Sequence, residues 1–230
     1  MASPPFYFFQ QQRLTLQCGS RLPAAQSLLQ LAGESVLLSQ LAPQPTAQQL
    51  LDAAEQAYQA GYEQQASTEF ELQGLALGGI GDPLLHTDVL AEFLPAFKQK
   101  RHGVPVTLIT YGLVAPGDAP VLCQQLLELE VEKLDIYLPA ANPPAYQQAV
   151  KPTQYGFSEL CQFIHTASEA GLQVTCFAYA PVAQQSELRA LALDLGARAF
   201  VVKTQPGGNK LSSSVRWRGS TASSNPSNLK

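Results

Sequence analysis

The sequence is poor in charged residues and contains no long hydrophobic run. Charged side chains make up 14% of its 230 residues, well below the roughly 25% that is typical of soluble domains. No apolar stretch approaches the roughly 18 residues that a membrane span requires. The apolar N-terminus also lacks the basic segment and the small-residue cleavage site of a secretory signal. We therefore predict an intracellular protein without a membrane partner, located in the cytoplasm, with an organelle as the alternative.

Cysteine motifs and an excess of basic charge are missing as well. The four cysteines, Cys18, Cys123, Cys161 and Cys176, lie far apart and form no CxxC pair. This spacing is typical of buried thiols in a reducing compartment, with a metal site assembled from distant residues as the alternative. The net charge of -4 does not indicate the basic surface that nucleic-acid binding requires. The partner that remains is a small molecule or another protein.

What the sequence does contain is enough apolar material for one sizeable core. Hydrophobic residues make up 46% of the chain, and a chain of this length is more often one domain than two. Residues 206–230 combine Ser, Gly and Asn with unopposed basic residues, which is typical of a flexible tail. We predict an N-terminal extension over residues 1–12, a domain over residues 13–205 and a tail over residues 206–230.

Apolar and β-branched runs alternate with helical patterns along the domain. The predicted strands are residues 14–18, 70–77, 104–111, 133–138, 172–179 and 198–203. The later strands are separated by a few tens of residues, the spacing of strand–helix–strand units with parallel strands. The pattern predicts a parallel α/β sheet, either open and twisted or curved into a partial barrel. In both, ligands bind at the carboxyl ends of the strands.

Helix start and stop signals lie between these strands. Thr46 and Gln49 form a capping box, and Gly171 and Gly196 stand where left-handed helix ends belong. Pro95, inside the pattern that follows Thr87, predicts a kink or an early end of that helix. Further helices are predicted over residues 119–130, 157–170 and 186–195.

A glycine cluster followed by an acid and a proline ends the predicted strand 70–77. Glycines at this point allow the backbone to approach a ligand closely. His86 follows a few residues later and is a candidate general acid or base, because its unperturbed pKa lies near neutrality. Together with Asp82 and Asp88 it is also a candidate metal ligand. No nucleophile elbow, zinc-protease helix, Walker loop or dinucleotide-binding glycine pattern is present.

The order of the strand-end motifs resembles that of the radical SAM core, closest to the subgroup linked to TatD-type proteins. The motifs are Gly79-Ile80-Gly81-Asp82-Pro83, Thr110-Tyr111-Gly112, residues 135–140, Tyr146 and Lys151-Pro152. The resemblance implies a partial (β/α)6 TIM-like barrel with parallel strands. It also implies a remnant of a SAM site at Gly79, Gly81, Asp82, Thr110 and Gly112.

The same resemblance implies that the iron–sulfur cluster is missing. Members of that family carry CxxxCxxC after the first strand, and three thiolates hold a [4Fe-4S] cluster. The corresponding positions here are Leu22, Gln26 and Leu29, none of which supplies a thiolate. Tyr111 stands where the family has a small polar residue. SAM thus stays a candidate cofactor, whereas the cluster is not expected.

Three functions follow from this sequence. The first is a radical-SAM-like pseudoenzyme that acts as a non-catalytic ligand-binding or interaction module. The second is a radical SAM enzyme whose cluster has unusual ligands, or whose cysteine motif is lost from this gene model. The third is a barrel enzyme that uses Asp82 and His86 for acid–base or metal chemistry.

Overall fold

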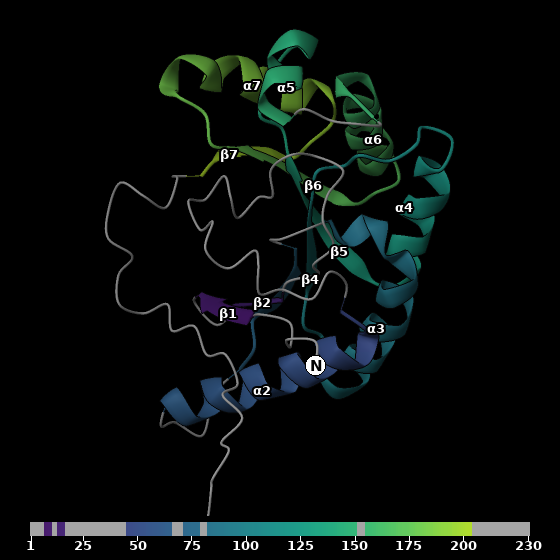
Figure 1. Ribbon diagram of the computed structural model, residues 1–230, viewed down its shortest axis with the longest axis vertical. Helices are drawn as coiled ribbons and strands as arrows, with labels where there is room; N and C mark the ends of the chain where they lie inside the picture. Colours follow the sequence, from purple (N-terminus) through teal and green to yellow (C-terminus); the bar gives the residue numbers. More distant parts are fainter. Residues whose placement is uncertain are drawn as a thin grey trace, which may run out of the picture.

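Seven strands follow one another through a single sheet in the order in which they occur in the chain (Figure 1). The computed structural model describes residues 7–10, 13–16, 45–65, 71–78, 82–150 and 155–203. Its strands are β1 (Tyr7–Gln10), β2 (Arg13–Leu16), β3 (Gly74–Leu77), β4 (Val106–Thr110), β5 (Val131–Tyr137), β6 (Gln173–Ala178) and β7 (Ala199–Val202). Strand β1 is antiparallel to β2, and β2 to β7 are parallel.

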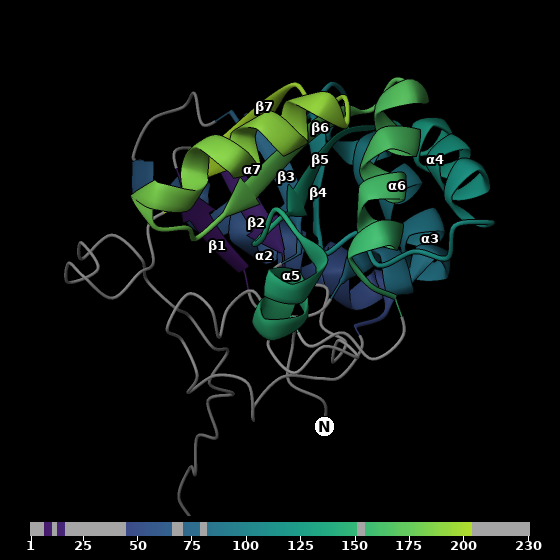
Figure 2. The same ribbon diagram turned by 90° about the horizontal axis from the view of Figure 1, so that it is seen from above.

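Helices connect the parallel strands. They are α2 (Ala47–Gln65), α3 (Thr87–Lys100), α4 (Ala119–Glu128), α5 (Pro143–Val150), α6 (Phe157–Glu169) and α7 (Val182–Asp194), with a short 3-10 turn η2 (Pro83–Leu85) before α3. Figure 2 shows α3, α4 and α6 side by side along one face of the sheet. We call this the outer face, and the opposite face the inner face.

The strand order distinguishes the two folds that the sequence left open. Connections between parallel strands are almost always right-handed, so strands in unbroken chain order carry their helices on one face and the sheet curves. A doubly wound sheet would instead require the order to reverse at a switch point. The protein therefore has the predicted partial α/β barrel with six parallel strands. Its described residues give no pairing between β1 and β7.

The outer face of the sheet is the centre of the hydrophobic core. Side chains alternate along each strand, and the outward-facing set has no solvent exposure at all: Leu14, Leu16, Leu75, Leu77, Val106, Leu108, Leu134, Ile136, Val174 and Cys176. Burial of each such side chain contributes about 1.5–3 kcal/mol relative to exposure. This continuous apolar layer explains why apolar residues recur at every second position of strands such as β6, where Val174 and Cys176 face outward.

Most of the predicted elements are confirmed, and three differ. The predicted capping box forms, because Gln49 N donates to Thr46 Oγ1 and Thr46 N donates to Gln49 Oε1. Strand β1 was not predicted and lies within the region assigned to the N-terminal extension. Helix α5 was not predicted either. The early end at Pro95 was wrong, since α3 continues to Lys100 with Leu94 and Phe97 buried on either side of the proline.

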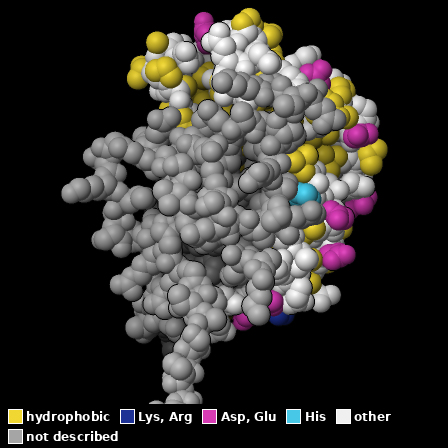
Figure 3. All heavy atoms as spheres, in the orientation of Figure 1, with side chains coloured by type: hydrophobic (Ala, Val, Ile, Leu, Met, Phe, Trp, Pro, Cys, Tyr) yellow, Lys and Arg dark blue, Asp and Glu magenta, His cyan; other side chains and the backbone are white. Residues whose placement is uncertain are grey.

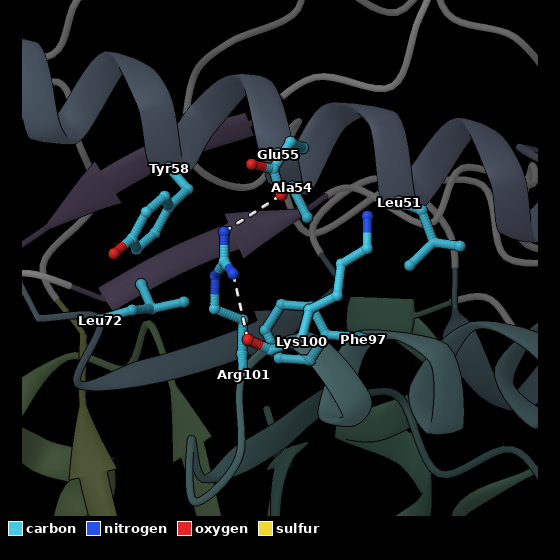
Figure 4. Close-up of a pocket in the computed structure, with 8 residues that line it drawn as sticks. All are labelled: Leu51, Ala54, Glu55, Tyr58, Leu72, Phe97, Lys100 and Arg101. Carbon is cyan, nitrogen blue, oxygen red and sulfur yellow. Dashed lines mark hydrogen bonds and ion pairs between the residues drawn. The ribbon is translucent and has the colours of Figure 1, made fainter.

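A salt bridge and a cation–π contact join helices α2 and α3 at the amino-terminal side of the sheet. Arg101, which ends α3, donates from Nη2 to Glu55 Oε2 over 3.1 Å. Its guanidinium also lies 3.9 Å from the centroid of the Tyr58 ring. Figure 4 shows these side chains around a hollow whose apolar floor includes Leu72 and Phe97. In α/β barrels this end contributes to stability, whereas ligands bind at the other.

The described surface shows no broad basic area on the face seen in Figure 3, where acidic side chains are scattered along the helical side. Among the described residues, no helix combines the length and apolar character needed to cross a bilayer. The expectation that nucleic acid is not a partner stays a prediction.

Gly78 is the point at which β3 comes closest to its neighbour. A Cβ atom added there would lie 2.6 Å from Ile109 Cβ and 2.8 Å from Ile109 O, and the Gly78 φ angle is +155°. The close approach that the sequence suggested is thus made to β4. Because both the backbone angle and the space exclude a side chain, only glycine is compatible with this site.

We expect Gly78→Ala to lower the free energy of unfolding by about 2–4 kcal/mol, through backbone strain and overpacking against Ile109. Urea denaturation measures this value. Gly117→Ala is the matched control, since nothing lies within 4 Å of a Cβ at that loop position. Equal stability of the two variants would show that β3 and β4 are not packed this closely.

Candidate functional site

A buried carboxylate ties the carboxyl ends of β3 and β4 together. Asp82 is 2% exposed, and it accepts hydrogen bonds from Leu84 N at 3.0 Å, from Thr110 Oγ1 at 2.7 Å and from Tyr111 N at 2.9 Å. The Thr110 hydroxyl in turn accepts from Gly112 N over 2.9 Å. We call this network the Asp82 bridge. It caps the η2 turn and sets where the chain leaves both strands.

The Asp82 bridge brings together three residues that the sequence analysis assigned to a cofactor site. Asp82, Thr110 and Gly112 are neighbours, and their polar groups bond mainly to one another. A ligand would have to replace one of these bonds to reach the carboxylate. Gly79 and Gly81, like Leu22, Gln26, Leu29 and Cys18, lie outside the described residues. Their part in SAM binding stays a prediction.

Burial raises the pKa of Asp82 above its usual range, while the hydrogen bonds from Thr110, Leu84 and Tyr111 and the nearby His86 act to lower it. The donors favour the charged form, and loss of water disfavours it. Because the carboxylate is enclosed and already accepts three bonds, its main role is to hold the loop.

His86 lies at the other end of the η2 turn, between the turn and α3. It is half-buried and lines a small hollow with Pro45, Pro83, Val89 and Leu90. No group of three or more His, Cys, Asp or Glu side chains in the described part of the chain is arranged to hold a metal. His86, Asp82 and Asp88 therefore do not make such a centre there.

Four tyrosines gather at the carboxyl ends of β4, β5 and β6. Tyr111 follows β4, Tyr137 ends β5, Tyr179 follows β6, and Tyr146 comes from α5. The rings of Tyr111 and Tyr137 meet edge to face at 5.5 Å, and Tyr137 lies 6.3 Å from Tyr179. We call these four residues the tyrosine cluster. Its position is where α/β barrels bind their ligands.

The phenols of the tyrosine cluster are neutral donors at neutral pH. Burial, with a contribution from Tyr179, raises the pKa of Tyr137 to about 12. Burial likewise raises the pKa of Tyr179. The pKa of Tyr111 is raised by burial and by the nearby Tyr137 and Asp82. A phenol that keeps its proton can donate a hydrogen bond to a ligand oxygen, but it cannot serve as a base.

Tyr146 differs from the other members because its hydroxyl has no hydrogen-bond partner among the described residues. Its side chain is 1% exposed and packs on Phe157 at 5.7 Å. Burial raises its pKa, as do the neighbouring Cys161, Tyr137 and Asp82. An unpaired buried hydroxyl costs about 1–3 kcal/mol. Such a group is typical of a site where a ligand or a water molecule supplies the missing acceptor.

The cysteines are consistent with buried thiols. Cys123 and Cys176 are buried and Cys161 is half-buried, with none of the three in a disulfide. Burial raises the pKa of Cys123 and Cys161 to about 11. Thiols with such values are poor nucleophiles and poor metal ligands near neutral pH.

The chain is not matched by any model of a known protein family or by any curated protein. Solved structures show a distant likeness. A protein described as a phosphonomutase, from Burkholderia cenocepacia J2315, shares 14% identity with a TM-score of 0.40, over 68% of this chain and 65% of the other. A 2,3-dimethylmalate lyase, a member of the PEP mutase/isocitrate lyase superfamily, shares 14% identity with a TM-score of 0.42, over 70% of this chain and 64% of the other. An enolase from Gibberella zeae PH-1 shares 11% identity with a TM-score of 0.37, over 68% of this chain and 35% of the other.

The match spans less than two thirds of the length of each of these proteins. Similarity at this level is too weak to transfer an activity. The predicted membership of the radical SAM superfamily was nevertheless wrong, because no family model matches and the similar structures are described as a mutase, a lyase and an enolase. The motifs that suggested it have a structural reason: an acid after β3 and a threonine at the end of β4 form the Asp82 bridge.

Most members of the tyrosine cluster were not recognised as site residues from the sequence. Tyr111 was noted as too large for a SAM pocket, and Tyr137 and Tyr179 were noted as parts of strand ends. The signal was present, since three predicted strands each carry a tyrosine at or next to their last position. Strand alternation then places all three on the inner face.

We expect Asp82→Asn to lower the free energy of unfolding by about 2 kcal/mol, because the amide places an NH2 group opposite a backbone N–H that loses its acceptor. The raised pKa of Asp82 means that the folded state holds the proton more tightly than the unfolded state. The stability that this group adds is fully present below about pH 3.9 and declines as the pH rises through the folded-state pKa.

The stability advantage of the wild type over Asp82→Asn should therefore shrink from acidic to neutral pH in urea denaturation. Asp88→Asn is the matched control, since Asp88 is an exposed acid in the first turn of α3 and its loss should cost about 0.5 kcal/mol. An advantage that grows with pH would mean that hydrogen bonding outweighs burial at Asp82.

Proposed function

We propose that this protein binds a small oxygen-bearing molecule at the carboxyl ends of its parallel strands, with the tyrosine cluster as the donor set. The observation that carries the proposal is the buried hydroxyl of Tyr146, which has no hydrogen-bond partner in the described part of the chain. The position of the cluster at the strand ends supports it, because ligands of parallel α/β folds bind at that edge. SAM stays one candidate ligand among molecules of this kind.

The chemistry that the tyrosine cluster supports is hydrogen-bond donation to oxygen. Phenols whose pKa is raised remain protonated, and several of them around one oxygen stabilise a negative charge there. They hold a carbonyl, hydroxyl or carboxylate oxygen in a site largely without water, where such bonds are stronger than in solution. Any reaction at this site would therefore draw on charge stabilisation by Tyr137 and its neighbours. A base for proton abstraction would have to come from elsewhere.

We expect Tyr146→Phe to stabilise the ligand-free protein by about 1 kcal/mol, since it removes a buried donor that lacks an acceptor. The melting temperature should rise by about 2–4 °C. The same variant should lose about tenfold in affinity for a compound that stabilises the wild type. A thermal-shift screen with small hydroxy, oxo and carboxylic compounds measures both effects.

Tyr58→Phe is the control, because Tyr58 lies in the hollow at the opposite end of the sheet. It should leave the response to every compound unchanged. If Tyr146→Phe lowers the stability of the ligand-free protein, the hydroxyl already has a partner and the proposal loses its basis.

A second candidate function is acid–base catalysis by His86. The observation that favours it is the half-buried imidazole in the wall of the hollow beside Pro83, next to the strand-end loop. Asp82 would then serve to hold the loop that carries the imidazole. His86→Gln keeps a polar side chain and removes the titrating group. Any activity found should fall and lose its pH dependence near neutrality in this variant, and an unchanged pH profile would exclude the role.

A further inference from the structure

Asp135 places a carboxylate on the inner face of the sheet, next to the level of the tyrosine cluster. It lies between Leu134 and Ile136, whose side chains are fully buried on the outer face, so strand alternation turns Asp135 to the inner face. Its register partners on the neighbouring strands are Ile109 and Thr175. Asp135 is half-buried, so solvent reaches part of the residue in the folded chain.

The Asp135 carboxylate has no partner among the described residues. It takes part in no ion pair there, and no described group donates a hydrogen bond to it. Lys133, two residues earlier on the strand, is exposed and does not pair with it. A half-buried carboxylate without a donor loses part of its hydration and gains no bond in return. A polar group in this condition is typical of a functional site.

The phenols lie one level nearer the carboxyl ends of the strands. Tyr137 follows Asp135 by two residues and shares its face, about 7 Å further along the strand. The ring of Tyr179 lies 6.3 Å from that of Tyr137, and Tyr137 pairs in register with Phe177. A small molecule held by these hydroxyls is therefore flanked by an acid on the side toward the middle of the sheet.

The phenols and the carboxylate have complementary proton chemistry. Burial raises the pKa of Tyr137 to about 12, so its hydroxyl donates to a ligand oxygen and does not act as a base. A carboxylate accepts protons, and aspartate is a common general base. Donors at an oxygen and a base near the adjacent carbon are the two groups that proton removal next to a carbonyl requires.

We propose that Asp135 is the general base of an enolisation at this site, and that the ligand is a small oxo compound with a hydrogen on the carbon next to its carbonyl group. This inference rests on the proposed function and adds a reaction to it. The C–H bond breaks, and the proton passes to a carboxylate oxygen of Asp135. The electron pair of that bond forms a C=C bond, while the π pair of the carbonyl group moves to its oxygen, where the phenols stabilise the charge. Return of a proton to the carbon restores the carbonyl compound, so no co-reactant is consumed.

Proton NMR in D2O tests the inference, because a proton held by Asp135 exchanges with solvent before it returns to carbon. The probes are pyruvate, 2-oxobutanoate and hydroxyacetone, and lactate is the control compound because its C2 atom is not a carbonyl carbon. The full chain should exchange the hydrogens next to the carbonyl group of at least one probe about 100-fold faster than buffer. Lactate should not exchange.

Asp135→Asn keeps the shape of the side chain and removes the base, so the exchange rate constant should fall about 100-fold or more with KM nearly unchanged. Tyr137→Phe should lower the rate about tenfold or more by removing one donor. Glu132→Gln is the matched control, because Glu132 is an exposed acid of the same strand. It should exchange like the wild type. Circular dichroism verifies that each variant is folded.

The outcomes separate this inference from the proposed function. If the thermal-shift screen finds a ligand that Tyr146→Phe weakens, but the wild type accelerates no exchange, the enolisation is wrong and the proposed function stands. If Asp135→Asn exchanges a probe as fast as the wild type, the assignment of the base is wrong. If neither the screen nor the exchange experiment gives a positive result, both proposals are wrong.

Discussion

One carboxylate determines the geometry of the strand-end region. Asp82 joins the loop after β3 to the last residues of β4 through three donors, one of them a side-chain hydroxyl that is itself held by Gly112 N. These bonds set the direction in which the chain leaves β4, and with it the position of Tyr111. Tyr137 then packs edge to face against the Tyr111 ring. A buried acid on the outer side of the sheet thereby orders the donors on the inner side.

The two faces of the sheet differ in the polarity of their side chains. The outer face is apolar apart from the Asp82 bridge at its carboxyl-terminal edge, and it supplies the burial that stabilises the fold. The inner face carries polar residues such as Asp135 and Thr175 at one level, with Tyr137 and Phe177 at the next. Polar groups on an inner face contribute little to packing unless they find partners. Their presence one level below the strand ends shows that the inner face is less apolar than the outer face.

Much of the fold was predictable from the sequence, whereas the site was not. Hydrophobic runs and helix caps such as the Thr46–Gln49 box depend on local physics, so the parallel strands followed from them. The same patterns left an open sheet and a partial barrel as alternatives, and only the family resemblance favoured the barrel. Strand β1 was not predicted from the sequence because it is short, with only four residues. The role of Asp82 depends on Thr110, distant in the sequence, which local patterns do not reveal. The motifs that this bridge requires were accordingly mistaken for those of a cofactor site.

The unbroken order of the strands has a consequence for how the protein is made. Each parallel strand pairs with the one synthesised just before it, so every unit finds its partner surface already present as the chain emerges from the ribosome. The partners are nevertheless far apart in the sequence, since a helix lies between each pair of parallel strands, and parallel pairing across such separations is slow. The last strand to arrive is β7, and Lys203 follows it. The sheet is therefore complete only once residues 199–202 have been synthesised, and its carboxyl-terminal edge is the last part of the described fold to reach full width.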